Sequence, residues 1–287
     1  MEGFRMKTLT LAGQTVPTIG IGTWHMGDQP RLRETEIAAI CAGVAAGARV
    51  IDTAEMYGSG RSEDLVGEAL SSLDRQQLFL ISKVLPENAS RDRMQTSLEA
   101  SLKRLRTDYL DLYLYHWRGS VPLAETVDEL QRLQDQGLIK AWGVSNFDIA
   151  DLQELWSLPN GPHAQANEDL YHLGSRGIDY AVLPWQREHQ LPLIAYSPIA
   201  QGDAWGQHLT TNPVVKQIAA QHGVSIYQVL LAWVIRDPQV LAIPQTSSVA
   251  HMQQNIAAMD LTLSDAELAA LDEQYPRPTR KEPLDVI

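Results

Sequence analysis

The stretch VIDTAEMYG occupies residues 50 to 58, and the rest of the chain is organised around it. Its first two residues are apolar and are typical of the end of a buried strand. Asp52 stands where that strand ends, and Tyr57 lies on the turn that Gly58 closes. A carboxylate and a phenol on one loop can carry out proton chemistry if a third group makes the phenol easier to ionise. The rest of the chain must supply that group.

Short apolar runs alternate with amphipathic segments on both sides of this stretch. Strands are predicted at 19–24, 50–52, 78–83, 109–114, 141–145, 163–167, 193–196 and 240–244. Helices are predicted at 34–46, 62–70, 90–105, 123–136, 148–156, 178–189, 213–221, 225–236, 249–258 and 264–273. This alternation favours the α/β class and a single closed (β/α)8 TIM barrel, with extra helices near the C-terminus.

The barrel is expected to fill one domain over residues 1–287, because barrels of this kind often reach such a length. Within it, residues 1–17 are predicted to hold an N-terminal β-hairpin, since the connection AGQ separates two short β-prone runs. Residues 276–287 form a Pro-rich C-terminal tail.

The composition is that of an ordinary globular protein, with 44% hydrophobic and 20% charged residues among 287. A formal charge of -12 would repel nucleic acid and anionic membranes, so neither is expected as a partner. Cys41 is the only cysteine, which excludes an intrachain disulfide and fits a reducing compartment. The sequence shows no signal peptide and no run long enough to span a membrane. We therefore expect a cytoplasmic protein.

Polar or aromatic side chains stand at the ends of the predicted strands. They are Trp24, Asp52, Lys83, His116, Ser145, Asn146, Gln165, Tyr196, Gln245 and Thr246. In barrels of this type the active site is built at the C-terminal ends of the strands. Asp52, Lys83 and His116 follow one another at intervals of 31 and 33 residues, about one strand-helix unit each. These side chains are therefore predicted to meet around one mouth.

The chemistry of this predicted mouth favours proton transfer to a carbonyl oxygen. A Lys83 ammonium near Tyr57 would lower the pKa of the phenol below its ordinary value of about 10. Asp52 would neutralise and hold Lys83, and His116 can donate a hydrogen bond to a carbonyl oxygen that is becoming an alkoxide. None of these four side chains carries a hydride, so a cofactor must bring it.

Five motifs resemble those of a known family, the aldo-keto reductases. They are GARVIDTAEMYG at 47–58, ISKV at 81–84, LYHW at 114–117, WGVSNF at 142–147 and AYSPI at 195–199. The resemblance extends from Ile19 to the helix after Val249. Within the family, residues 183–185 and 195–202 are most similar to the bacterial methylglyoxal reductase-like (2,5-diketo-gluconate reductase-like) group.

The resemblance implies an NAD(P)H-dependent enzyme that reduces aldehydes or ketones to alcohols. It makes Tyr57 the general acid, Lys83 and Asp52 the groups that tune it, and His116 the group that orients the carbonyl. It also implies a monomer that acts on small carbonyl substrates. No metal site is expected, because the other histidines show no paired ligand spacing.

The resemblance also implies the residues around the ligands. Ser145, Asn146 and Gln165 match positions that hold the nicotinamide carboxamide, Tyr196 matches the ring under the nicotinamide, and Ser197 begins a pyrophosphate loop. The implied cofactor contacts are Thr23, Trp24, Asp52, Ser145, Asn146, Gln165, Tyr196, Ser197, Pro198, Ile199, Gln201, Gly202, Gln245, Thr246, Ser247, Ser248, His251, Gln254 and Asn255. The predicted substrate pocket consists of Trp24, Tyr57, His116, Trp117 and Trp205.

One departure from the family concerns the cofactor phosphate. In members that use NADPH the segment after the eighth strand reads IPKS, with an arginine soon after, and both cations pair with the ribose 2′-phosphate. Here the segment reads IPQTSS, so Gln245 replaces the lysine, and His251 falls where the arginine would be. The expected cofactor is NADP(H), with NAD(H) or dual use left open and with reduced discrimination between the two.

Two other functions remain open from the residues alone. Lys83 could form a Schiff base with a carbonyl substrate, which would make the protein a lyase. The chain could also be a cofactor-binding regulatory subunit with little turnover, although all four residues of the predicted proton device are present.

Overall fold

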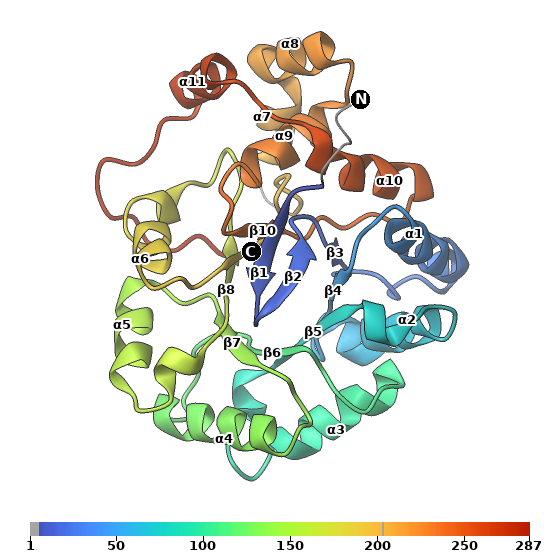
Figure 1. Ribbon diagram of the computed structural model, residues 1–287, viewed down its shortest axis with the longest axis vertical. Coiled ribbons are helices and arrows are strands. Elements are labelled where there is room, and N and C mark those ends of the chain that lie inside the picture. The colour runs from blue at the N-terminus through green and yellow to red at the C-terminus, as the bar shows by residue number, and fades with distance from the viewer. Residues whose placement is uncertain (1–5, 203) are drawn as a thin grey trace.

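The computed structural model describes residues 6–202 and 204–287, and within them eight parallel strands form the wall of a barrel in chain order (Figure 1). The strands are β3 (Ile21–Gly22), β4 (Val50–Asp52), β5 (Phe79–Val84), β6 (Leu112–Tyr115), β7 (Trp142–Ser145), β8 (Asn167–Leu170), β9 (Leu193–Tyr196) and β10 (Val240–Ala242). The first and last close the barrel, because Gly20 N donates to Ala242 O over 2.8 Å and Gly22 N donates to Pro244 O over 3.1 Å. The predicted (β/α)8 barrel is confirmed.

Helices surround the strands as an outer ring (Figure 1). They are α1 (Arg33–Ala45), α2 (Arg61–Leu70), α3 (Met94–Leu105), α4 (Leu123–Asp135), α5 (Ile149–Ser157), α6 (Val182–Glu188), α7 (Gly206–Thr211), α8 (Pro213–His222), α9 (Ile226–Val234), α10 (Val249–Ala257) and α11 (Asp265–Gln274). Several begin at side chains that satisfy free backbone N–H groups, such as the capping boxes at Asp148, Ser225 and Ser264. Within the described residues, no helix has the length and apolar character needed to cross a membrane.

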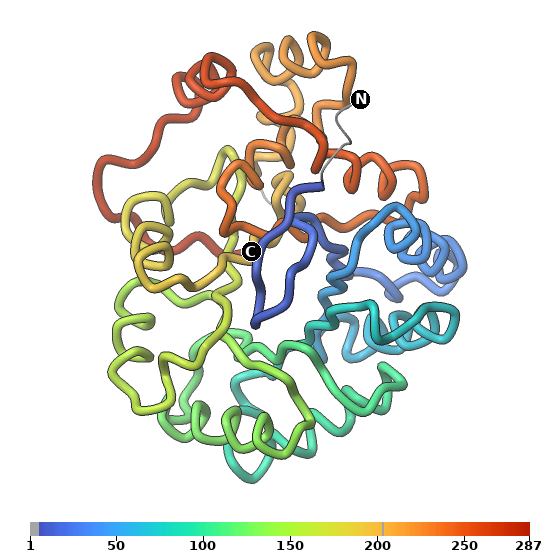
Figure 2. The backbone as a smooth tube through the Cα atoms, viewed as in Figure 1, coloured from blue at the N-terminus to red at the C-terminus, as the bar shows by residue number. Residues whose placement is uncertain are grey.

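An antiparallel hairpin, β1 (Thr8–Leu11) and β2 (Gln14–Pro17), closes the N-terminal end of the barrel (Figure 2). Its apolar side chains pack onto the residues that point into the barrel. This cluster consists of Leu9, Leu11, Val16, Val50, Phe79, Ile81, Leu112, Leu114, Ala141, Ala166, Ile194, Leu241 and Ile243. The predicted hairpin is confirmed, and it leaves the opposite end of the barrel as the open one.

Alternation along the strands decides which side chains reach that open end. Successive residues of a strand point to opposite faces, so every second residue points into the barrel. Beyond the buried cluster, the next positions of the same parity are Asp52, Lys83, His116, Ser145, Glu168, Tyr196 and Gln245. The inward-pointing positions of the strands thus hold the hydrophobic cluster near the hairpin and the polar side chains at the open end.

The sixth barrel strand lies later in the chain than predicted. The sequence indicated 163–167, but the structure has a 3₁₀ turn at Gly161–His163 and begins β8 at Asn167. Pro162 lies inside that turn and lacks the backbone N–H that a central strand needs. The C-terminal end of this strand is therefore at Leu170, and Gln165 lies before the strand begins.

The hairpin's contribution to stability can be tested at Leu11. Its side chain is fully buried under the barrel, whereas Thr10 on the same strand is exposed. We expect Leu11→Ala to lower the free energy of unfolding by about 2–5 kcal/mol, the usual cost of truncating a buried leucine. Urea denaturation measures it, with Thr10→Ala as the matched control. Equal and small losses for both variants would contradict this role of the hairpin.

Candidate active site

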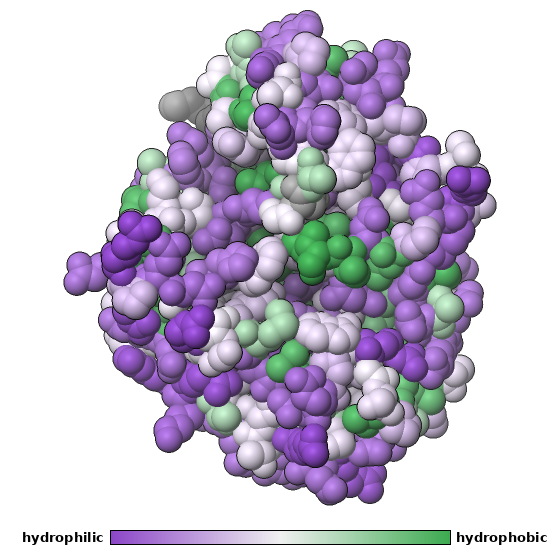
Figure 3. All heavy atoms as spheres, turned by 180° about the vertical axis from the view of Figure 1, so that it is seen from behind, coloured by the Kyte–Doolittle hydropathy of each residue, from purple (hydrophilic) through white to green (hydrophobic). Residues whose placement is uncertain are grey.

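A cavity of about 710 Å³ opens at the C-terminal ends of the strands. Figure 3 shows the face opposite the hairpin, where hydrophobic side chains gather around a hollow near its middle. Most residues that line the cavity come from the C-terminal ends of the strands or from the segments that follow them, and Val286 and Ile287 come from the end of the chain. This is the end at which the sequence placed the active site.

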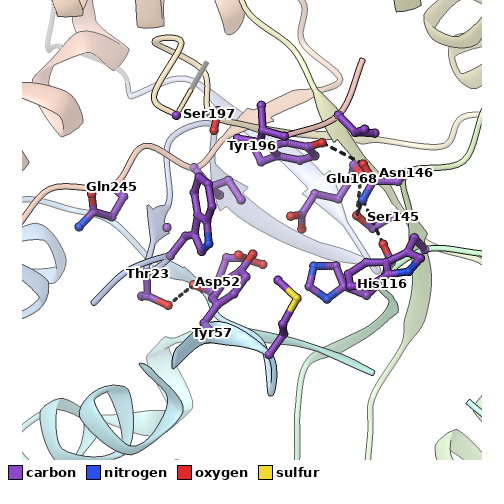
Figure 4. A pocket seen from close by; sticks show the side chains of 18 of the residues that line it. Thr23, Asp52, Tyr57, His116, Ser145, Asn146, Glu168, Tyr196, Ser197 and Gln245 are labelled. Carbon is purple, nitrogen blue, oxygen red and sulfur yellow. Dashed lines mark hydrogen bonds between the residues drawn. The ribbon is translucent and has the colours of Figure 1, made fainter. Parts of the chain in front are cut away.

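A fully buried lysine, Lys83, contacts side chains that line the cavity. The Lys83 Nζ lies 2.6 and 2.8 Å from the two carboxylate oxygens of Asp52 and 3.0 Å from the hydroxyl oxygen of Tyr57. It also donates to the backbone carbonyl of Thr53 over 3.1 Å. The rings of Tyr57 and His116 are 6.0 Å apart, centroid to centroid, with both polar edges at the cavity (Figure 4). The structure thus brings together the four residues of the predicted proton device.

The turn after β4 gives Tyr57 its position. Gly58, Ser59 and Gly60 have φ angles of 58°, 54° and 90°, all in the left-handed region. Glycine adopts this region without steric cost, so the two glycines allow the chain to reverse sharply before α2. That reversal leaves the Tyr57 phenol beside Asp52 (Figure 4), with its hydroxyl oxygen 3.0 Å from the Lys83 Nζ.

Neighbouring carboxyl groups stabilise the positively charged form of Lys83. Burial opposes the ammonium form, but the carboxyl groups of Asp52 and Glu168 outweigh burial and hold the pKa of Lys83 well above its ordinary value. His116 behaves in the opposite way, because burial and then the nearby Lys83 charge lower its pKa to about 2. The imidazole is therefore neutral and carries one N–H donor.

The net shift at Tyr57 differs from the expectation. Lys83 does pull the pKa of the phenol down, but burial is the larger effect and raises it above the ordinary value. The predicted net lowering is wrong, because the burial of the phenol could not be judged from the sequence. Tyr57 consequently keeps its proton across the neutral pH range and is available as a donor.

The side chain that the sequence missed is Glu168. It is buried on β8, lines the cavity, and places Oε1 at 3.3 Å from the Lys83 Nζ. Gln165, the residue predicted in this place, precedes the strand and is an odd number of residues from Glu168, so it falls on the opposite face. Its side-chain amide donates to the His163 carbonyl, away from the cavity. The run of buried polar residues at 167–169 was the signal that could have located the end of this strand.

Most of the other predicted contacts lie around the same space. The predicted residues that line this cavity are Thr23, Trp24, Asp52, Tyr57, His116, Trp117, Ser145, Asn146, Tyr196, Ser197, Gln201, Gly202 and Gln245. Asn146 joins two of these walls, because its amide donates to the His116 carbonyl and accepts from the Tyr196 hydroxyl. Residues that the sequence did not indicate also line it, namely Gly22, His25, Met56, Arg118, Asp151, Glu168, Ile243, Val286 and Ile287.

A second cavity of about 360 Å³ adjoins the first. Gln201 and Gln245 line both cavities and are joined by hydrogen bonds between the Gln201 side chain and the Gln245 backbone. The predicted contacts Ile199, Thr246, His251 and Asn255 lie here. Among the described residues that line this cavity, none is a lysine or an arginine.

Six of the predicted contacts line neither cavity, and one of them is Gln165. Pro198, Ser247 and Gln254 are each next in the chain to a residue that lines a cavity, and Ser248 caps α10 by accepting from His251 N. Trp205 was expected as a wall of the substrate pocket, and this is wrong. Its ring packs against Gly174 and makes an edge contact with Tyr275, because α7 starts directly after it and turns the ring away from the mouth.

The comparisons with known proteins agree with this geometry. The model of the aldo/keto reductase family matches residues 18–276. Methylglyoxal reductase YeaE of Escherichia coli (strain K12) is 50% identical over 284 residues, which cover 99% of this chain and 100% of that protein. Methylglyoxal reductase DkgB of Salmonella typhi is 32% identical over 90% of this chain and 94% of its own.

A solved structure is similar over the whole length. The crystal structure of an aldo-keto reductase from Klebsiella pneumoniae in complex with NADPH matches with a TM-score of 0.96 and 48% sequence identity, covering 99% of this chain and 100% of that one. Family model, relatives and structure all point to the same family. The chain belongs to the aldo/keto reductase family.

Proposed function

We propose that this protein reduces the carbonyl group of small aldehydes and ketones with NADP(H), and that Tyr57 gives the proton. The observation that carries the proposal is the Lys83 ammonium, which contacts the Asp52 carboxylate on one side and the Tyr57 hydroxyl on the other. A proton donor held against a buried cation, at the mouth of a deep cavity, is suited to protonating an oxygen that gains negative charge.

The residues present fit a nicotinamide cofactor. The two cavities meet at Gln201 and Gln245, so an elongated ligand can run from the catalytic cavity into the second one. Two buried polar atoms of the catalytic cavity, His116 Nδ1 and Glu168 Oε2, have no hydrogen-bond partner among the described residues. Tyr196 and Asn146 would hold the nicotinamide end, and Thr246 and His251 the phosphate end. When bound, the cofactor supplies the hydride.

The chain's own side chains account for the proton. The neutral His116 imidazole orients the substrate by donating to its carbonyl oxygen. As negative charge develops there, the O–H bond of Tyr57 breaks and its proton moves to that oxygen, because an alkoxide is a much stronger base than a phenolate. The phenolate left on Tyr57 is stabilised by the Lys83 ammonium at 3.0 Å. Asp52 keeps that ammonium in place.

The same contacts argue against a Schiff-base lyase. A lysine must be a neutral amine to attack a carbonyl carbon. Burial opposes the charge on Lys83, but Asp52 and Glu168 outweigh it and hold the pKa of the lysine well above its ordinary value. All protons of the ammonium are directed at oxygen atoms within the protein. Lys83 is therefore suited to tuning Tyr57 rather than to covalent chemistry.

The rim of the cavity favours uncharged substrates. Arg118 is the one lysine or arginine among the described residues that line the catalytic cavity. Its guanidinium contacts the carboxylates of Glu154 at 2.8 Å and Asp151 at 3.3 Å, which more than balance its charge. An anionic substrate would meet these carboxylates. We therefore propose small neutral carbonyls, including methylglyoxal, which the names of the two bacterial relatives specify.

The role of Tyr57 is tested by Tyr57→Phe. Removing the hydroxyl removes the proton donor, so we expect kcat for methylglyoxal with NADPH to fall by about 10²- to 10⁴-fold. Binding of NADPH, followed by fluorescence titration, should change little, and Tyr180→Phe on the exposed surface serves as the control. Unchanged turnover in Tyr57→Phe would refute the assigned mechanism.

Cofactor selectivity is tested at Gln245. Because none of the described residues that line the second cavity is a lysine or an arginine, we expect the wild-type preference for NADPH over NADH, measured as the ratio of kcat/KM values, to stay below about a thousandfold, or 4 kcal/mol. Gln245→Lys should raise that ratio by about ten- to a hundredfold through a charge-assisted hydrogen bond. The uncharged Gln245→Leu is the matched control. A lysine variant with an unaltered ratio would show that residue 245 does not meet the phosphate.

Selection by the acidic rim is tested at Glu154. With 4-carboxybenzaldehyde and 4-nitrobenzaldehyde as a charged and an uncharged probe, Glu154→Gln should raise the charged-to-uncharged ratio of kcat/KM about two- to fivefold. The ratio within one enzyme cancels the different reactivities of the two aldehydes. Glu99→Gln, on the outer helix α3, should leave the ratio unaltered. An equal effect of both variants would contradict the proposal.

A further inference from the structure

The mouth of the barrel contains one carboxyl group more than its lysine can neutralise. Asp52 and Glu168 are both 1% exposed, and both contact the Lys83 ammonium, at 2.6 and 3.3 Å. Among the described residues, neither carboxyl group has a second lysine, arginine or histidine as an ion partner. Two carboxylates beside one ammonium would leave an unbalanced negative charge on side chains that are almost fully buried. Such a charge is avoided when one carboxyl group keeps its proton.

Glu168 is the better candidate for that proton. Both oxygens of Asp52 contact Lys83, whereas Glu168 offers only Oε1, and its Oε2 has no hydrogen-bond partner among the described residues. Burial, and then the charge of Asp52, raise the pKa of Glu168 well above its ordinary value. Glu168 makes one contact with the Lys83 ammonium, at 3.3 Å, whereas Asp52 makes two shorter ones, and this difference assigns the proton to Glu168.

Every element around Glu168 contributes to this balance. The titratable groups that face it are Asp52 on β4, Tyr57 on the following turn, Lys83 on β5, His116 after β6 and Tyr196 on β9. His116 is neutral, and both tyrosines hold their protons because burial raises their pKa values. Lys83 is therefore the one cation in this group, and Asp52 already takes its closest contacts.

We propose that Glu168 is a positioning residue that carries one proton beside Lys83, and that loss of this proton weakens Tyr57 as a proton donor. The proposal rests on the proton-donor role of Tyr57 given above. When Glu168 releases its proton to solvent, a second negative charge appears 3.3 Å from the Lys83 ammonium. The Glu168 charge raises the pKa of Tyr57, so the phenol gives up its proton less readily.

The direction of the pH effect follows from these charges. Glu168 has its pKa raised in the folded protein, so the folded state binds a proton that the unfolded chain has already lost near neutral pH. Stability from this group is complete below the ordinary glutamate pKa of about 4.3 and is lost as the pH rises through the raised value. The rate of carbonyl reduction should decline over the same alkaline range in which Glu168 ionises.

Glu168→Gln tests the proposal, because glutamine has the shape and hydrogen-bond donor of the protonated acid but cannot ionise. We expect the melting temperature of the variant, minus that of the wild type, to increase by several degrees between pH 6 and pH 9. Glu129→Gln is the control, since Glu129 is equally buried but is paired with Arg132 on α4. For this control the difference in melting temperature should not depend on pH.

The second measurement is the pH profile of kcat with NADPH and 4-nitrobenzaldehyde, each enzyme normalised to its own maximum. We expect the alkaline decline in Glu168→Gln to move up by about one pH unit or more, whereas Glu168→Asp, which keeps an ionisable group, should retain a decline. Parallel melting curves across pH together with an unmoved profile would overturn the proposal. If the melting difference between Glu168→Gln and the wild type depends on pH but Tyr57→Phe stays active, the proton on Glu168 stands and only the role of Tyr57 is overturned.

Discussion

The contact between the Lys83 ammonium and the Asp52 carboxylate is the interaction on which the site depends. Both groups are removed from water, which costs free energy that their attraction must offset through good geometry. The geometry is good: both carboxylate oxygens lie within 2.8 Å of the ammonium. With its charge fixed in this way, Lys83 can act on the Tyr57 phenol. Replacing either member of the pair alone would leave a buried charge without a partner.

The barrel supplies that geometry through strand register. Asp52 pairs with Ile81 across the β4–β5 ladder, so Lys83, two residues beyond Ile81, points into the same space one step closer to the mouth. Lys83 in turn pairs with Leu114, and His116 is two residues beyond that. The hydrophobic cluster under the hairpin determines which alternate positions of each strand point into the barrel. It therefore also determines which polar side chains meet at the open end. Stability and chemistry in this protein depend on the same alternation.

Much of this could be predicted from sequence, because the signals are local. The apolar runs located the strands, and Asp52, Lys83 and His116 were found from their places at strand ends. Gln165 was wrong because Pro162 displaces the start of β8, and a shift of a few residues changes both parity and position. Glu168, the correct inward residue, was missed for the same reason. The position of Trp205 depends on α7, a short helix in a segment without a clear periodic pattern.

The net effect on Tyr57 could not be predicted, because it is a difference between two large opposing effects. The sequence identified the cation that lowers the pKa of the phenol, but the burial that raises it comes from the packing of several elements around Tyr57. The same holds for the closeness of Val286 and Ile287 to the cavity, which depends on the path of residues 276–287 across the molecule. Such properties arise from tertiary packing and leave no short motif.

The most direct test of the central claim is a double-mutant cycle on kcat/KM with Tyr57→Phe, Lys83→Met and the combined variant. NADPH binding by fluorescence titration verifies that each variant still folds around its cofactor. If Lys83 acts through Tyr57, removing the lysine from an enzyme that already lacks the phenol hydroxyl should cost little, and the two losses should be strongly non-additive. If the fold-loss in kcat/KM of the double variant equals the product of the two single losses, Lys83 does not act through Tyr57 and the account is contradicted.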